Sequence, residues 1–173
     1  MRYAKGFSLI ELLIVVAIIL VIAAIAIPNL LQAKLAANES SAAGSIRSIT
    51  GAEITYFNTY PTVGYATKIT QLGGPGPCTP SPTTACLIDD FLANATPGGA
   101  GKSGYYYLAT GSITGGASYN DAYVIGAAPI VVHSTGNRDF CSTNDGVLRS
   151  QLGNTGDTPA NVVATCLAYP VAQ

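Results

Sequence analysis

The chain has 173 residues, which is enough for one domain together with a membrane segment. Charged residues make up 10% of the sequence, far below the roughly 25% of an average soluble domain. The formal net charge is −1, and removal of residues 1–6 would leave 6 basic against 9 acidic side chains, a net charge of −3. Because so few basic side chains remain to bind phosphates, the composition does not indicate a nucleic-acid partner.

The segment from Phe7 to Ile27 is apolar almost throughout, and Glu11 is its one charged residue. Its 21 residues would form a helix about 31 Å long, which matches the roughly 30 Å hydrocarbon core of a bilayer. A carboxylate at the centre of such a span costs roughly 2.5–3.5 kcal/mol, so we expect Glu11 to have a role. Arg2 and Lys5 precede the segment, and the positive-inside rule places the N-terminus in the cytoplasm.

Two simpler interpretations of this segment stand beside a functional one. The first is a secretory signal peptide, for which Ala24-Ile25-Ala26 supplies a nominal small-x-small cleavage site. Against it, the apolar run exceeds the usual 7–15 residues, and Glu11 is out of place inside such a region. The second is a plain membrane anchor with no further task.

The residues around Glu11 form a motif. The run KGFSLIELLIVV at residues 5–16, followed by Pro28-Asn29, resembles the N-terminus of type IV prepilins. The resemblance implies that residues 1–6 are a leader peptide, which a membrane aspartyl peptidase removes by cutting after Gly6. The same enzyme would then N-methylate Phe7. Gly6 suits this role because a residue without a side chain lets a protease approach the backbone closely.

The resemblance also gives Phe7, Glu11 and Pro28 roles in assembly. Cleavage would leave Phe7 with a positively charged α-amino group, and Glu11 lies one helical turn further on, about 6 Å along the axis. In a monomer the carboxylate could neutralise the amine of its own chain. In a fibre it could pair with the amine of a neighbouring subunit, because an unpaired charge is unfavourable in a low-dielectric environment.

One long helix is expected over residues 7–60, with residues 7–27 in the membrane and the remainder packed on a domain. Pro28 lacks a backbone donor, which predicts a kink or a local break, and a helix boundary at Ile27 is the alternative. The helical pattern resumes beyond Pro28, and Pro61 ends it. Apolar residues recur along one helix face at Leu31, Leu35, Ala42, Ile46, Ile49, Tyr56 and Tyr60.

The rest of the chain predicts a connector followed by a sheet. Residues 61–104 are rich in Gly, Pro, Ser and Thr and read as a variable connecting loop, with a short helix at 88–92. Residues 105–173 predict a small antiparallel sheet and a C-terminal region, with a turn at residues 144–146. A long helix packed on such a sheet is an α+β fold, as the type IV pilin resemblance implies. The expected strands are 105–110, 123–128 with the start of 129–132, 138–141, and 146–149.

The four cysteines are Cys78, Cys86, Cys141 and Cys166. They permit three pairings, of which Cys78–Cys86 and Cys141–Cys166 are the simplest local loops, and the sequence alone does not choose. Disulfides would place this part of the chain in an oxidising compartment, whereas four free thiols would be the cytosolic alternative. No Cys-x-x-Cys pair is present, and the single His133 cannot complete an ordinary zinc site.

No residue pattern points to catalysis, a cofactor or a metal. His133 is expected to be a surface or strand-end residue, and Tyr105-Tyr106-Tyr107 to serve packing and not electron transfer. Asp89-Asp90 and the pair Asp139 and Asp145 are weak calcium candidates, because the Asp-x-Asp-x-Asp-Gly loop is absent. An enzyme function has no support in the sequence.

The sequence therefore favours a structural protein. Its resemblance implies a subunit of an extracellular type IV pilus, which polymerises with identical copies through the N-terminal helix. Other partners would be the prepilin peptidase and methyltransferase, the assembly platform of the bacterial inner membrane, and the membrane itself before assembly. A pseudopilin of a type II secretion system is the first alternative, since it would share the N-terminal motif. A minor or tip pilin with an adhesive role is the second.

Overall fold

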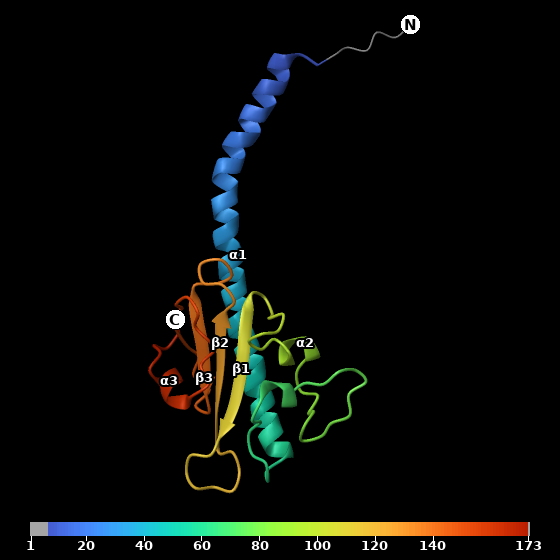
Figure 1. The fold of residues 1–173 in the computed structure, drawn as a ribbon, viewed down its shortest axis with the longest axis vertical. Coiled ribbons are helices and arrows are strands. Elements are labelled where there is room, and N and C mark those ends of the chain that lie inside the picture. Colours follow the sequence, from blue (N-terminus) through green and yellow to red (C-terminus); the bar gives the residue numbers. More distant parts are fainter. Residues whose placement is uncertain (1–6, 173) are drawn as a thin grey trace. The chain divides into compact units, whose positions relative to one another are not determined.

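The computed structural model describes residues 7–172, so the expected leader 1–6, with Gly6, lies outside the described residues. The chain forms two compact units, one ending at Lys34 and the other beginning at Leu35. A long helix and a four-stranded antiparallel sheet confirm the predicted α+β class (Figure 1). The elements are α1 (Leu9–Thr59), η1 (Ile69–Gln71), α2 (Asp90–Ala93), β1 (Tyr105–Ser112), β2 (Ala122–Pro129), β3 (Arg138–Thr143), β4 (Arg149–Leu152) and α3 (Val163–Leu167).

Helix α1 is continuous from Leu9 to Thr59 and ends just before Pro61. It contains Pro28 without a break, and the alternative of a helix boundary at Ile27 is wrong. A proline inside a helix removes one hydrogen bond and crowds the preceding turn. Leucine and alanine residues, which are good helix formers, follow Pro28 closely and favour continuation of the helix.

From Leu35 onward, α1 packs one face against the rest of its unit. The buried members of the predicted apolar face are Ala42, Ile46, Ile49 and Tyr56. Leu31, which belongs to the other unit, is 58% exposed, so the packed face begins later than the periodicity predicts. The packed face also contains Glu39 and Glu53, which the apolar pattern did not predict.

The core between α1 and the sheet is rich in tyrosine. The largest fully buried side chains include Tyr56, Tyr105, Tyr107 and Tyr123. The hydroxyl of Tyr56 donates to the carbonyl of Pro82 at 2.5 Å, and that of Tyr105 donates to the carbonyl of Arg138 at 2.9 Å. Two residues of the predicted tyrosine run, Tyr105 and Tyr107, thus point into the core, and the hydroxyl of Tyr105 fixes the start of β3.

The connector between α1 and β1 contains two short helices in addition to its turns. Asp89 caps α2, since its carboxylate accepts the amide of Leu92 at 2.8 Å. This places the short helix at Asp90–Ala93, two residues later than predicted at its start. A disulfide within the connector joins Cys78 to Cys86.

The strands follow one another in space in the order β1-β2-β3-β4, and each neighbouring pair is antiparallel. The fourth predicted strand, 146–149, is present but lies later than predicted, because β4 begins only at Arg149. Asp145 provides the reason: its carboxylate accepts the amide of Val147 at 3.0 Å and pairs with Arg149 at 2.6 Å. These bonds close a loop over the residues where the strand was expected, and the Arg149 guanidinium lowers the pKa of Asp145 to about 2.

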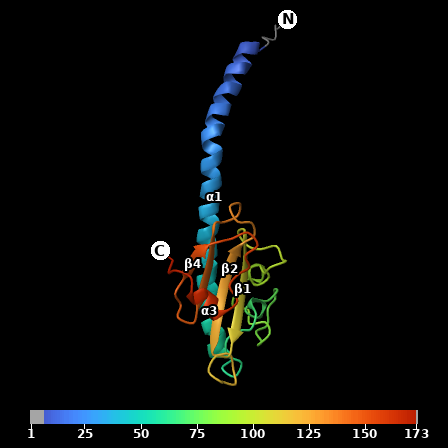
Figure 2. The ribbon, with the colours of Figure 1, turned by 60° about the vertical axis from the view of Figure 1, so that its left-hand side comes forward.

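The C-terminal segment covers the sheet face that points away from α1 (Figure 2). There a second apolar cluster contains Val124, Ala160 and Tyr169. The segment is anchored by the disulfide between Cys141 of β3 and Cys166 of α3. At Gly126 a Cβ atom would lie 2.3 Å from the backbone of Ala160, so only glycine lets the segment approach this closely.

We expect the two disulfides to stabilise the fold unequally. They close loops with sequence separations of 25 and 8 residues, for which the chain-entropy relation gives about 3.5 and about 2.5 kcal/mol. The double variant Cys141→Ala/Cys166→Ala should therefore lose more unfolding free energy than Cys78→Ala/Cys86→Ala. Urea unfolding of the full chain in detergent measures both, and equal or reversed losses would contradict the assignment.

Candidate assembly segment

The N-terminal part of α1 exposes apolar side chains on all sides. Its large hydrophobic residues between Phe7 and Leu31 are 44% to 81% exposed, with Val16 and Phe7 at the two limits. The helix is long and apolar enough, by length and composition, to cross a membrane. A helix that is hydrophobic all round is stable only when lipid or other protein covers it.

Glu11 lies in the first turn of this apolar helix. One of its carboxylate oxygens accepts the backbone amide of Ser8 at 3.3 Å. The carboxylate is therefore directed toward the N-terminal end of α1, where the helix dipole favours a negative charge. Ser8 directly follows Phe7, so the carboxylate contacts the residue next to the expected first residue of the processed chain.

Pro28 is not part of that turn. It lies 17 residues after Glu11, about 26 Å along a helix axis. Among the predicted assembly residues, Glu11 lies in the first turn of α1, Phe7 precedes the helix, and Pro28 lies farther along it. The expected cleavage residue Gly6 lies outside the described residues.

Glu39 links α1 to the loop between β2 and β3. Its two carboxylate oxygens accept the amide of Asn137 at 2.9 Å and the Nε of Arg138 at 3.1 Å. The neighbouring Asn38 donates to the carbonyl of Thr135 at 2.8 Å. One turn of α1 therefore holds the segment that leads into β3.

Glu53 is a second acidic residue on the packed face of α1, and it is fully buried. One carboxylate oxygen accepts the amide of Ala66 at 2.9 Å, while the other has no hydrogen-bond partner among the described residues. Burial raises the pKa of Glu53 to about 8, and the bond from Ala66 opposes this only in part. Glu53 is therefore largely protonated at neutral pH.

Asp139 is the buried acid on the opposite face of the sheet. It is 2% exposed, and neither carboxylate oxygen has a hydrogen-bond partner in the described part of the chain. Burial, reinforced by the nearby carboxylate of Asp157, raises the pKa of Asp139 to about 7. Because Asp139 lies beneath the C-terminal segment, the packing of that segment depends on the protonation state of the Asp139 carboxyl.

The spacing of the predicted face contained a signal for both buried glutamates. The apolar positions jump by seven residues from Leu35 to Ala42 and again from Ile49 to Tyr56. Glu39 and Glu53 fill those two gaps and complete an alternation of steps of four and three. Asp139 gave no such signal, because its burial depends on a C-terminal segment that is distant in sequence.

The other candidate residues take part in local structure. His133 is exposed, and its Nδ1 lies 3.0 Å from Oδ1 of Asn137. Asp89 caps α2 and pairs with Lys102 at 3.6 Å, whereas Asp145 pairs with Arg149. Within residues 7–172, no group of three or more His, Cys, Asp or Glu side chains is placed to hold a metal ion.

Comparison with known proteins finds matches to the N-terminal segment. A family model for the prokaryotic N-terminal methylation motif matches residues 1–27. The type IV wide pilus major component PilA4 of Thermus thermophilus is 65% identical over 40 residues, which cover 23% of this chain and 30% of that relative. The chain thus matches less than a third of the relative's length, and no solved structure matches it.

These findings define a class. The chain is similar to type IV pilins: it carries the N-terminal methylation motif of prokaryotic prepilins, and 40 of its residues match a type IV pilus component. Its long helix and small antiparallel sheet agree with the α+β fold expected of a pilin. The family it resembles is structural and not enzymatic.

We expect stability to fall as the pH rises from about 4.5 to about 8, because Glu53 stays protonated in the folded state over this range and ionises when the chain unfolds. Asp139 acts in the same direction up to about pH 7. Glu53→Gln should therefore flatten the dependence of the melting temperature on pH between 5 and 8.

Asp145→Asn is the matched control. The folded-state pKa of Asp145 is about 2, below its ordinary value, so its contribution is lost only in acid and is constant between pH 5 and 8. This variant should melt earlier but keep the wild-type slope. A Glu53→Gln variant with the wild-type slope would overturn the assignment.

Proposed function

We propose that the chain is a structural subunit of an extracellular type IV pilus, processed between Gly6 and Phe7 and polymerised through its hydrophobic N-terminal helix. The observation that carries the proposal is the uncovered apolar part of α1, with the single charge of Glu11 in its first turn. The methylation motif over residues 1–27 supports the processing step, and the match to a major pilus component supports the assignment to a filament.

Processing prepares the helix for assembly. Removal of residues 1–6 takes away Arg2 and Lys5 and creates one amino group on Phe7. The Glu11 carboxylate already accepts the backbone amide of Ser8, which directly follows Phe7. The new amine on Phe7 of the same chain therefore lies near this carboxylate. In the filament a neighbouring copy supplies the amine instead, which fixes the axial register of the two helices.

The apolar segment also determines where the chain resides. Before assembly, the bacterial inner membrane covers residues 7–27, with the N-terminus in the cytoplasm and the sheet outside. The prepilin peptidase and methyltransferase act there, and an assembly platform in the same membrane extracts the subunit. After assembly, the helices of identical copies replace the lipid. The chain needs no catalytic activity for this role.

Mass spectrometry of purified surface filaments tests the assignment. We expect this chain to be the dominant subunit, with a mature mass that begins at N-methylated Phe7. If the chain is only a trace component of the filaments, it is a minor or tip pilin. If cells lacking it keep their filaments but lose protein secretion, it is a pseudopilin.

Replacement of Glu11 tests the assembly mechanism. Glu11→Ala and the isosteric Glu11→Gln should both insert into the membrane and be processed, yet yield few or no filaments, because both remove the negative charge. Glu11→Asp keeps the charge and should retain part of the assembly. The readouts are the mass of the membrane-bound chain and the amount of sheared filament. Normal filaments from Glu11→Ala would refute the mechanism.

A further inference from the structure

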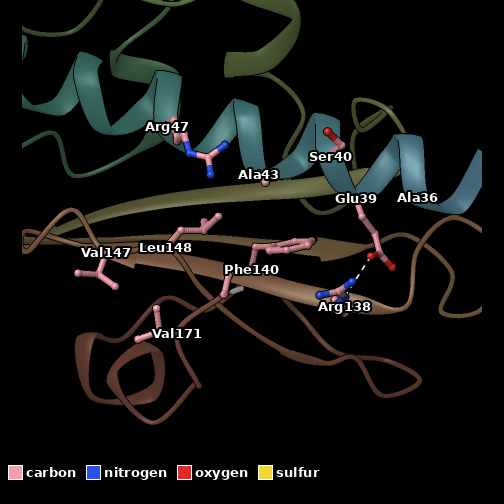
Figure 3. Close-up of a pocket in the computed structure, with 11 residues that line it drawn as sticks. Ala36, Glu39, Ser40, Ala43, Arg47, Arg138, Phe140, Val147, Leu148 and Val171 are labelled. Carbon is pink, nitrogen blue, oxygen red and sulfur yellow. Dashed lines mark hydrogen bonds and ion pairs between the residues drawn. The ribbon is translucent and has the colours of Figure 1, made fainter.

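A groove opens between α1 and the β3–β4 side of the sheet (Figure 3). Its volume is about 480 Å³, and all the residues that line it belong to the unit that begins at Leu35. Ala43 of α1 and Phe140 and Leu148 of the sheet side provide apolar walls. The volume exceeds that of a phenyl ring, so the groove has room for one large side chain.

Two arginines border the groove, and they differ in their partners. Arg138 is paired with Glu39 at 3.1 Å. Arg47 is exposed and makes no ion pair within residues 7–172. In Figure 3 its side chain extends from α1 toward the sheet side of the groove. The groove therefore combines apolar walls with one cation that the chain itself does not neutralise.

Helix α2 carries an exposed aromatic ring and an exposed carboxylate, which complement the apolar walls of the groove and its arginine that is unpaired within residues 7–172. Phe91 is 59% exposed, although its neighbours Leu92 and Ala93 are buried and anchor the helix. Asp89 is engaged with Lys102, whereas Asp90 is exposed and makes no ion pair in the described part of the chain. We call Asp90 and Phe91 the α2 knob: an aromatic ring beside one unneutralised carboxylate.

The groove and the α2 knob lie at opposite edges of the same sheet. The segment after α2 is bonded to β1, since the amide of Tyr107 donates to the carbonyl of Ala95 at 2.8 Å. The groove is lined by β3 and by the residues just before β4, at the other end of the strand order. One copy therefore cannot fill its own groove with its own knob. Two different surfaces that meet head to tail give a ring or an open helical assembly and not a two-fold dimer, and the open form is the one that fits a filament.

We propose that the α2 knob of one copy docks in the groove of a second copy. The ring of Phe91 packs against Phe140 and Leu148, and the Asp90 carboxylate faces the Arg47 guanidinium. Burial of the ring provides most of the affinity, because an exposed ion pair contributes little by itself and mainly sets the orientation. The inference rests on the proposed function in one respect, namely that identical copies assemble side by side.

A photo-crosslinker tests the contact directly. The full chain with benzoyl-phenylalanine in place of Phe91 is irradiated in filaments and in membranes. We expect a product of twice the chain mass, with the crosslink mapped by mass spectrometry to the peptide around Phe140 or Leu148 of the second copy. The same crosslinker in place of Ser118, an exposed residue between β1 and β2, is the control and should not reach that peptide. The absence of the expected product, or a crosslink to another site or another protein, overturns the proposal.

A charge exchange gives an independent readout. Arg47→Glu and Asp90→Arg should each reduce sheared filaments at least about fivefold, and the double variant should restore them, because the exchanged pair again attracts. Ser118→Glu adds a negative charge elsewhere and should change nothing. Normal filaments from Arg47→Glu, or no recovery in the double variant, refute the docking but not the proposed function. If the wild-type chain forms no filaments, the proposed function fails, and the crosslink in membranes still decides the contact.

Discussion

The rest of the molecule depends on a conflict within the first part of α1. Between Phe7 and Leu31, apolar side chains on every side of the helix require lipid or protein around them. In the same first turn, the Glu11 carboxylate requires a polar or charged partner. Lipid covers the apolar side chains but offers the carboxylate no polar or charged partner. A bundle of like helices that also brings an amino group to Glu11 would satisfy both, and this is the driving force that the proposed assembly assigns to Glu11.

The unit that begins at Leu35 meets a different requirement, since in the proposed function it stays folded outside the membrane. Glu39 fastens α1 to the segment before β3, and the Cys141–Cys166 disulfide holds the C-terminal segment on the far face of the sheet. Glu53 lies in the core, where burial raises its pKa to about 8 and so favours the neutral form. These links make the sheet and the second part of α1 one body, in which the groove and the α2 knob keep fixed positions.

Features set by local sequence could be predicted, and features set by distant contacts could not. The long helix and the α+β class follow from apolar periodicity and from the motif around Glu11. Helix α1 continues through Pro28, so the local break expected there is absent. The start of β4 was misplaced because side-chain bonds of Asp145 close a loop there. Burial of Asp139 depends on a segment that is far away in the chain, so no local sequence pattern predicts that this residue is buried.

The pairing of Glu11 with the amino group of another copy is the central claim, and solid-state NMR of mixed filaments tests it most directly. Half of the copies carry ¹⁵N-phenylalanine and the other half carry glutamate labelled with ¹³C at the side-chain carboxyl. The account predicts dipolar transfer between the N-terminal amine nitrogen and a glutamate carboxyl carbon, which in such filaments can arise only between copies. Transfer that appears only when both labels are in the same chain would show that Glu11 neutralises its own amine, and would contradict the claim.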